Sequence, residues 1–212
     1  MTRLPLLFLL ACFSSVLPSR FEARFAFRWD AHLRACVDSV YGITDNRALD
    51  RLAQLYCESA FNPRAVSDYG GWKKAKLDTL TALLTGKGAG GLAQFIWQTA
   101  KRYGADSVQM LFDPLWSIKA ECRYMKGISR YLATTRNPKA RRALMIDRKF
   151  GELCATAGYN TGEGRIRDRL NRYGANWQSI GSSILPEPRL YAEKIALVST
   201  QMRLEARWRA LL

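Results

Sequence analysis

The sequence has little histidine, no two cysteines spaced as Cys-x-x-Cys, and no long apolar run. His32 is the single histidine of the 212-residue chain, which excludes sites built from several histidine ligands and leaves any Ser/His or Cys/His dyad dependent on that residue. Leu33 and Cys36 follow it on a short apolar helix pattern, so we expect a structural role for His32. No apolar stretch reaches the roughly 18 residues that cross a bilayer as a helix, which excludes a polytopic membrane protein.

Acidic residues are also scarce. The chain has 18 Asp and Glu against 33 Lys and Arg, a formal net charge of +15. This charge attracts polyanions, which include nucleic acid, anionic lipid and the carboxylate-bearing peptides of bacterial cell wall, and charge alone does not choose among them. Glycine and proline are few, with 15 and 7 residues, and 48% of the chain is hydrophobic. That composition is typical of one globular domain with a short appendage and excludes disordered and collagen-like chains.

The N-terminal segment 1–19 has the pattern of an export signal. A positive start is followed by an aliphatic stretch from Leu4 to Ala11 and then by small residues. The stretch ending in Cys12 also resembles a bacterial lipobox, which would anchor the chain to a membrane as a lipoprotein. The alternative is an uncleaved hydrophobic arm. We therefore expect an exported protein of the periplasm or cell envelope, or a component of a phage virion.

Four further cysteines allow two interpretations. Disulfides are possible in an exported chain with an even number of cysteines. Three of the four lie in apolar helical segments, which equally favours buried free thiols. The residues concerned are Cys36, Cys57, Cys122 and Cys154.

Hydrophobic periodicity predicts a mainly α fold. Asp45 is the expected N-cap of a helix that ends before Asn62 and Pro63, which places Glu58 on its last turn. We interpret 86–91 as a flexible linker with glycines at positive φ, 20–44 as a helical connector, and 201–212 as a basic amphipathic end of the last helix. Further helices are predicted at 72–84, 92–103, 114–134, 139–158 and 188–211.

Four short motifs occur in a set order. Residues 58–65 are ESAFNPRA, 90–95 are GGLAQF, 157–164 are AGYNTGEG and 187–191 are EPRLY. In this order they resemble the soluble lytic transglycosylase (SLT) family, with its ES-x-FNP-x-A, GL-x-Q and YN-x-G-x-G motifs and a late E-T-x-x-Y segment. The resemblance extends over roughly residues 45–200, which we take as the lytic transglycosylase domain.

The resemblance implies a lysozyme-like α domain that cleaves the bond between N-acetylmuramic acid (MurNAc) and N-acetylglucosamine (GlcNAc) in peptidoglycan without adding water. Glu58 would act first as general acid and then as general base, and the substrate's own N-acetyl oxygen would replace a second carboxylate. Apolar surroundings would keep Glu58 protonated. Asp68 is the nearest other acid in the sequence and is interpreted as a turn residue. No metal or other cofactor is implied.

The remaining candidate site residues come from the other motifs. By analogy with the family, Gln94 would hydrogen-bond the substrate N-acetyl group, and Tyr159 would place its hydroxyl near the acid or the sugar. Asn160 would hold the adjoining turn. The late segment contributes Tyr191 and Glu187, which the family brings back toward the site. Phe61 is expected to anchor its loop in the core.

The chain departs from the family pattern at three places. Gly90 and Ala93 stand where serine or arginine and methionine are common, which predicts a smaller pocket floor and a missing hydroxyl partner for the glutamate. Pro188 replaces the threonine of the late segment. Residues 71–88 form a Lys-rich helical insertion that either flanks the cleft or packs elsewhere or on a partner.

Three functions remain open from the sequence. The first is an exported muramidase-like lyase whose partner is the peptidoglycan glycan strand, used in wall remodelling, by a secretion apparatus or by a phage. The second is a catalytically degenerate wall-binding or structural component of a phage virion or secretion apparatus. The third, a nucleic-acid-binding protein, is disfavoured because the chain lacks a helix-turn-helix or RNA-binding signature and carries an export signal.

Overall fold

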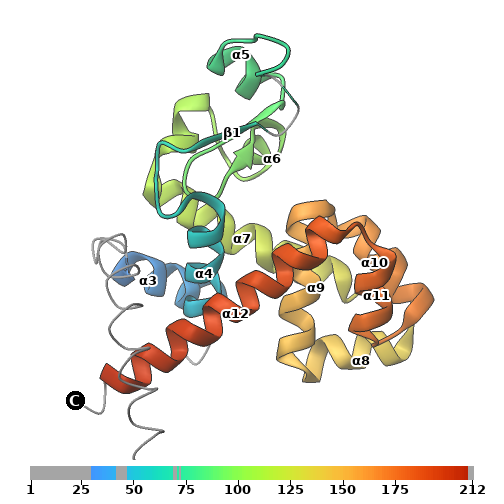
Figure 1. The fold of residues 1–212 in the computed structure, drawn as a ribbon. Coiled ribbons are helices and arrows are strands. Elements are labelled where there is room, and N and C mark those ends of the chain that lie inside the picture. The colour runs from blue at the N-terminus through green and yellow to red at the C-terminus, as the bar shows by residue number, and fades with distance from the viewer. Residues whose placement is uncertain (1–29, 42–46, 69–70, 72, 210–212) are drawn as a thin grey trace, which may run out of the picture.

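The structure is a computed structural model that describes residues 30–41, 47–68, 71 and 73–209 (Figure 1). These residues are mostly helical with one small sheet, which confirms the predicted mainly α, lysozyme-like class. A small lobe that contains the sheet stands beside a larger helical lobe. The long helix α12 (Pro186–Arg209) runs diagonally across the molecule and packs on α4 (Ala48–Ser59) and α9 (Arg148–Thr161) (Figure 1).

The sheet contains three short antiparallel strands in the order β1-β2-β3. They are β1 (Val66–Asp68), β2 (Gly88–Gly90) and β3 (Phe95–Ile96). The interpretation of 86–91 as a flexible linker is wrong, because β2 is the buried central strand. The predicted positive φ is confirmed at Gly86 and Gly91, on either side of this strand. A Cβ on Gly90 would lie 3.4 Å from side-chain atoms of Leu83 and Phe112, so the small residues of β2 let both side chains pack closely on the sheet.

The insertion is less helical than the sequence predicts. Its only described helix is α5 (Thr79–Leu84), at the outer tip of the small lobe (Figure 1). Residues 73–76 form turns instead of a first helical turn. The helix begins where it does because the Asp78 side chain caps it, accepting a 2.9 Å hydrogen bond from the backbone N–H of Thr81.

Two further short elements complete the small lobe, α6 (Trp97–Arg102) and the 3-10 helix η2 (Val108–Phe112). The predicted helix at 92–103 is therefore reduced to its second half, because β3 occupies 95–96. The described part of the predicted helical connector 20–44 is α3 (Asp30–Tyr41), which packs on α7 (Pro114–Leu132). The Asp113 side chain caps α7 and Pro114 occupies its first turn, as a proline at a helix start favours.

The helical lobe differs from the prediction in two respects. The predicted helix at 139–158 is two helices, α8 (Pro138–Ile146) and α9, because Asp147 ends the first and caps the second. The region 163–183 was not predicted to be helical and forms α10 (Glu163–Tyr173) and α11 (Trp177–Ser183).

The core has two parts that meet along α7. Ile118 and Cys122 belong to the part shared with α3, α4 and the sheet, whereas Ile128 and Leu132 belong to the part shared with α8–α11. Tyr124 and Tyr159 pack against both parts. The junction of the two lobes is therefore lined by aromatic rings.

Several smaller predictions have clear outcomes. Cys36, Cys122 and Cys154 are buried free thiols and Cys57 is a half-buried one. Among the described residues, His32 contacts the Leu115 carbonyl and the Cys36 sulfur, as a structural histidine does. Phe61, Val198 and Met202 are buried, so the loop after α4 and the last helix are both docked on the core.

Other predictions fall outside the described residues. The export signal or arm at 1–19, Cys12 and the expected N-cap Asp45 all lie there, and α4 begins after Arg47, whose side chain makes no capping bond. Within the part of the chain that is described, no helix is both long enough and apolar enough to span a bilayer.

The tight approach of Gly91 to η2 gives a stability prediction. Gly91 has φ +81°, and a Cβ there would lie 1.6 Å from the Leu111 carbonyl oxygen. Gly91→Ala should therefore lower the free energy of unfolding by at least about 3 kcal/mol, because it combines backbone strain with a clash. Gly104 has φ +88° with open space around it, so Gly104→Ala should lose only about 1–2 kcal/mol. Urea unfolding of both variants measures the difference, and equal losses would contradict it.

Candidate active site

Glu58 lies on the last turn of α4, as predicted, but the helix stops for a different reason. Ala60 and Phe61, three and two residues before Pro63, both adopt the left-handed conformation, with φ 51° and 61°. Such residues are strained unless their surroundings fix them. Burial of Phe61, whose ring centroid lies 5.5 Å from that of Tyr56, fixes this turn. The chain therefore leaves the helix sharply and holds Glu58 at the helix end.

The Glu58 carboxyl is bonded to Tyr191 of α12. The Tyr191 hydroxyl donates a short hydrogen bond to Glu58 Oε1, although the two residues lie 133 positions apart. The pKa of Glu58 is raised to about 7. Burial is the main cause and the charge of Glu121 adds to it, while the Tyr191 hydrogen bond and Lys194 act in the opposite direction. The residue as a whole is half-buried, so part of Glu58 remains accessible to solvent. This carboxyl can hold a proton near neutral pH and release it.

Tyr159 lies close to this group but points its hydroxyl elsewhere. The hydroxyl donates a 2.5 Å hydrogen bond to the backbone carbonyl of Ala93. The ring packs against Phe95 and Tyr124, with centroid distances of 6.1 and 5.0 Å. Burial raises the pKa of Tyr159 well above its usual range, and the Glu58 charge adds to this effect. The hydroxyl is therefore tied to the second motif and is not free to meet the acid.

Gln94 braces the loop that carries it. Its backbone has φ 50°, and its side-chain Nε2 donates to the carbonyls of Gly91 at 2.7 Å and Ala65 at 3.1 Å. Both amide hydrogens are thus used within the protein. The Oε1 atom is buried and has no hydrogen-bond partner among the described residues. The one unpaired polar atom of Gln94 is therefore an acceptor that protein atoms cover in this structure.

The other predicted residues occupy less central positions. Asn160 is half-buried in the last turn of α9, and Glu187 is exposed in the first turn of α12, one turn before Tyr191. Asp68 is exposed at the end of β1, opposite Gly88. Among the described residues, none of these three has a hydrogen bond to Glu58. The structure thus brings Tyr191 to Glu58 and does not bring Glu187 or Asp68 into direct contact with it.

The expected consequences of the unusual second motif need correction. Gly90 and Ala93 are buried, and side-chain atoms of Leu83 and Phe112 lie 3.4 Å from where a Cβ on Gly90 would be. A hydroxyl partner for the glutamate is present after all, because Tyr191 supplies it from the far end of the sequence.

Sequence reasoning missed three buried polar residues behind Glu58. Arg51 and Gln54 of α4 and Glu121 of α7 are fully buried, and Arg51 donates hydrogen bonds to both Gln54 and Glu121. The sequence pattern carries no signal for them, because residues 51, 54 and 58 share the helix face opposite the apolar positions 49, 52, 53 and 56, where solvent exposure is expected.

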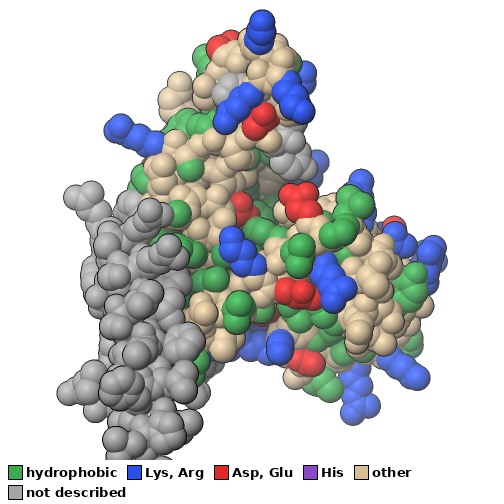
Figure 2. Space-filling model, in the orientation of Figure 1, with side chains coloured by type: hydrophobic (Ala, Val, Ile, Leu, Met, Phe, Trp, Pro, Cys, Tyr) green, Lys and Arg blue, Asp and Glu red, His purple; other side chains and the backbone are tan. Residues whose placement is uncertain are grey.

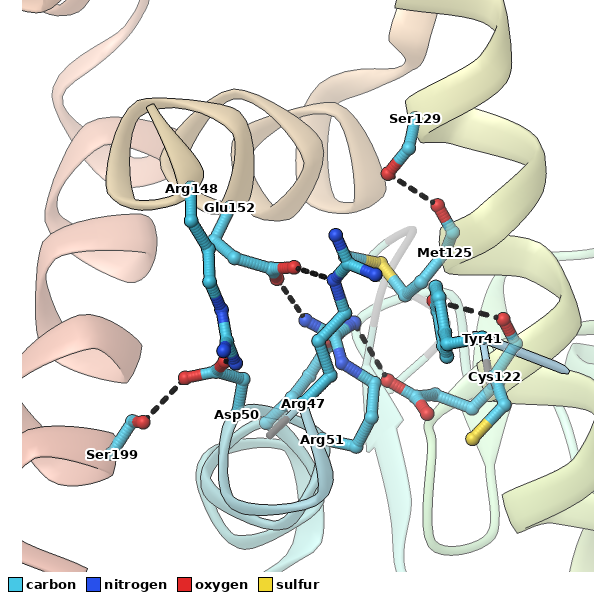
Figure 3. Close-up of polar contacts among 12 residues, drawn as sticks. Tyr41, Arg47, Asp50, Arg51, Cys122, Met125, Ser129, Arg148, Glu152 and Ser199 are labelled. Carbon is cyan, nitrogen blue, oxygen red and sulfur yellow. Dashed lines mark hydrogen bonds and ion pairs between the residues drawn. The ribbon is translucent and has the colours of Figure 1, made fainter. Parts of the chain in front are cut away.

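A separate pocket of about 340 Å³ lies at the opposite end of α4 and does not include Glu58. Asp50 lies in its wall and receives hydrogen bonds from Arg148 at 2.9 Å, from Arg203 at 2.7 Å and from Ser199 at 2.5 Å. Figure 3 shows Asp50, Arg148 and Ser199 converging there from three helices. In the described ranges, no group of three or more His, Cys, Asp or Glu side chains could hold a metal ion.

Residues 50–179 match the family described as the Transglycosylase SLT domain. The chain belongs to this family. The match includes Glu58, Gln94, Tyr159 and Asn160 and ends before Glu187 and Tyr191, so the packing of α12 adds Tyr191 to the site from outside the matched segment. SLT domains are generally those of lytic transglycosylases, which act on peptidoglycan. No curated protein and no solved structure matches the chain.

Removal of the Tyr191 hydroxyl should raise the pKa of Glu58. A hydrogen bond donated to a carboxylate stabilises its charged form, so Tyr191→Phe should move the Glu58 titration midpoint upward from about 7. Tyr159→Phe is the matched control, since its hydroxyl is bonded to Ala93 and the midpoint should change less. Carbon-13 NMR titration of labelled glutamate carboxyls, with Glu58 assigned from Glu58→Gln, measures both. A larger shift in the control would contradict the assignment.

Burial of Glu58 should also make the stability of the SLT domain depend on pH. The unfolded carboxyl loses its proton near pH 4.5 and the folded one near 7. Stability from the protonated carboxyl is therefore present below about 4.5 and lost as the pH rises through 7. The free energy of unfolding of wild type should therefore fall between pH 4 and pH 8 by roughly 2–3 kcal/mol more than that of Glu58→Gln. Urea unfolding at both pH values measures this difference, and Glu187→Gln, at an exposed carboxyl, should show a much smaller one.

Proposed function

We propose that this SLT protein is a peptidoglycan lytic transglycosylase that cleaves the β-1,4 bond between MurNAc and GlcNAc and leaves a 1,6-anhydroMurNAc end. The observation that carries the proposal is the Glu58 carboxyl, held at the end of α4 with a pKa of about 7 beside the Tyr191 hydroxyl. A carboxyl of this kind can give up and regain a proton at neutral pH.

The first step is bond cleavage. Protonated Glu58 donates its proton to the oxygen of the glycosidic bond while the N-acetyl oxygen of MurNAc attacks the anomeric carbon. The bond between that carbon and the leaving oxygen breaks, GlcNAc departs with a hydroxyl, and the MurNAc becomes an oxazolinium cation. Glu58 is left as a carboxylate, so no second carboxylate is needed.

The second step closes the ring. The Glu58 carboxylate accepts the proton of the MurNAc 6-hydroxyl, whose oxygen attacks the anomeric carbon and displaces the N-acetyl oxygen. The product is the 1,6-anhydro sugar, Glu58 is protonated again, and no water has been consumed. The Tyr191 hydroxyl stabilises the carboxylate between the two steps by donating a hydrogen bond to it.

The other candidate residues have positioning roles in this proposal. Gln94 would accept a hydrogen bond from the N-acetyl N–H through Oε1, its one unpaired polar side-chain atom, and this requires a shift of the residues that cover Oε1. Asn160 and Glu187 would contact the substrate from the ends of α9 and α12, and Tyr159 would form part of the wall beneath it.

The surface supports a polyanionic substrate. Lys and Arg side chains are spread over both lobes, and the outline of the molecule is recessed between the lobes (Figure 2). The net charge of +15 would attract the carboxylates of peptidoglycan stems in a salt-sensitive way. We propose export to the periplasm or cell envelope, with segment 1–19 as signal or anchor. We propose a phage virion or a secretion apparatus as the alternative setting of the same activity.

The products decide the reaction. Purified peptidoglycan treated with the chain lacking residues 1–19 should release muropeptides about 18 Da lighter than the hydrated sugars, because water is not added. Glu58→Gln should reduce their release by at least about a hundredfold. Mass spectrometry of the soluble products measures both.

Three other results would overturn parts of this proposal. Hydrated reducing ends would mean a hydrolase with a second carboxylate. Undiminished cleavage by Glu58→Gln would remove Glu58 from the mechanism. Binding to peptidoglycan without any product, in wild type and variant alike, would favour the wall-binding structural role.

A further inference from the structure

A buried polar stripe on α4 leads from the protein interior to Glu58. Arg51, Gln54 and Glu58 are spaced by three and four residues, so they lie on one face of the helix. Arg51 and Gln54 are fully buried. Arg51 Nη1 donates a 2.8 Å hydrogen bond to Gln54 Oε1, one helical turn before Glu58.

Glu121 of α7 is tied into this stripe by the same guanidinium nitrogen. Arg51 Nη1 donates to Glu121 Oε1 at 3.1 Å. Arg51 Nη2 donates to Glu152 of α9 at 2.5 Å, and Figure 3 shows this second bond. The exposed fractions of the two carboxylate side chains differ, at 1% for Glu121 and 19% for Glu152. One arginine therefore holds a solvent-facing carboxylate on one side and a fully enclosed one on the other.

The buried contacts among Arg51, Gln54 and Glu121 are expected to add little to the stability of the fold. Glu121 Oε2 and Gln54 Nε2 are buried and have no hydrogen-bond partner within the described residues. Each such group costs roughly 1–3 kcal/mol, and a buried ion pair often contributes less than apolar residues of the same volume. A role other than stability would explain why the enclosed carboxylate is there.

We propose that Glu121 is a positioning residue for Glu58: its carboxylate, fixed by Arg51 inside the domain, keeps the proton on Glu58 near neutral pH. The inference deepens the proposed function and depends on it only for the catalytic consequence. The electrostatic part concerns two carboxyls and is testable without turnover.

The hydrogen bonds decide which carboxyl ionises first. Glu121 is bonded to the cation Arg51, whereas Glu58 is bonded to the neutral Tyr191 hydroxyl. The remaining charged group acting on Glu58 is Lys194 of α12, an exposed residue. The cation therefore favours charge on Glu121, and the like charge of Glu121 disfavours charge on Glu58.

The charge of Glu152 also acts on Glu121 and raises its pKa, but the opposing effect of the Arg51 charge is larger. Five further titratable groups around the pair are uncharged. Tyr159 of α9 faces both carboxyls, and Cys57 of α4 faces Glu58. Tyr41 and Cys36 of α3 and Cys122 of α7 face Glu121. The pKa of each of these groups is raised by burial, so all five are neutral near pH 7. Burial also raises the pKa of Glu58 and of Glu121 to about 7, so the two carboxyls titrate as a coupled pair.

The test compares two isosteric changes on the same arginine. Glu121→Gln removes the enclosed charge and keeps an acceptor for Arg51, whereas Glu152→Gln removes the partner on the other side. Carbon-13 NMR titration of the glutamate carboxyls in the full chain gives the midpoint of Glu58. We expect Glu121→Gln to lower that midpoint by roughly half a unit or more and Glu152→Gln to leave it nearly unchanged. No shift with Glu121→Gln, or equal shifts with both, would overturn the proposal.

A second measurement covers the case in which Glu121→Gln does not fold. If Glu121 ionises first, it loses its proton while Glu58 is still neutral, so its midpoint in Glu58→Gln should stay close to its wild-type value and below the wild-type midpoint of Glu58. A Glu121 midpoint in Glu58→Gln above the wild-type midpoint of Glu58 would overturn the proposal, because Glu121 would then be uncharged while Glu58 titrates.

The catalytic readout separates this proposal from the proposed function. A general acid must be protonated, so the rate falls as the pH rises through the pKa of Glu58. Glu121→Gln should move this alkaline limb to lower pH by the shift seen in the NMR titration, with the rate at low pH retained. A parallel loss at all pH values would mean a structural role and overturn the proposal. A chain that releases no anhydro product but shows the coupled titration would refute the proposed function alone.

Discussion

The burial of one carboxyl at the end of α4 is the constraint on which the candidate site depends. The Glu58 carboxyl is largely buried and bonded to a neutral hydroxyl, while the buried cation Arg51 is bonded to Glu121 instead. Each of these conditions needs a different helix, since Tyr191 comes from α12 and Glu121 from α7. The site therefore exists only when α4, α7 and α12 are packed in register, and the sharp turn at Ala60 and Phe61 fixes where α4 stops.

Three helices connect the candidate site with the charged pocket at the other end of α4. Asp50 precedes Glu58 by about 12 Å along α4, and Arg203 follows Tyr191 by about 18 Å along α12, from the rise of 1.5 Å per residue. The bonds of Asp50 to Arg148 and Arg203 join α4 to α9 and α12 at that far end. This network, which contacts no candidate substrate residue, keeps the helices aligned where they meet Glu58.

Elements that depend on neighbouring residues in the sequence, such as helix caps and periodic apolar positions, could be predicted. Elements that depend on contacts between distant segments could not. Pro114 after Asp113 marked the start of α7, and the helix ending near Glu58 followed from its periodicity. The central strand β2 escaped because Gly88, Ala89 and Gly90 have no strand propensity and are held by their neighbours. Glu58 and Tyr191 were both predicted, but Tyr159 and Gln94 bind backbone carbonyls, which no side-chain pattern reveals. The Arg51–Glu121 pair joins residues 70 positions apart.

The central claim is that one buried carboxyl suffices because the substrate, not water, supplies the second nucleophile. Cleavage of purified peptidoglycan in water enriched in oxygen-18 tests this most directly. The account predicts anhydro products that carry no label, since the oxygen that closes the ring is the sugar's own 6-hydroxyl oxygen. One labelled oxygen at each new reducing end would show that water attacks the anomeric carbon, and it would contradict the account.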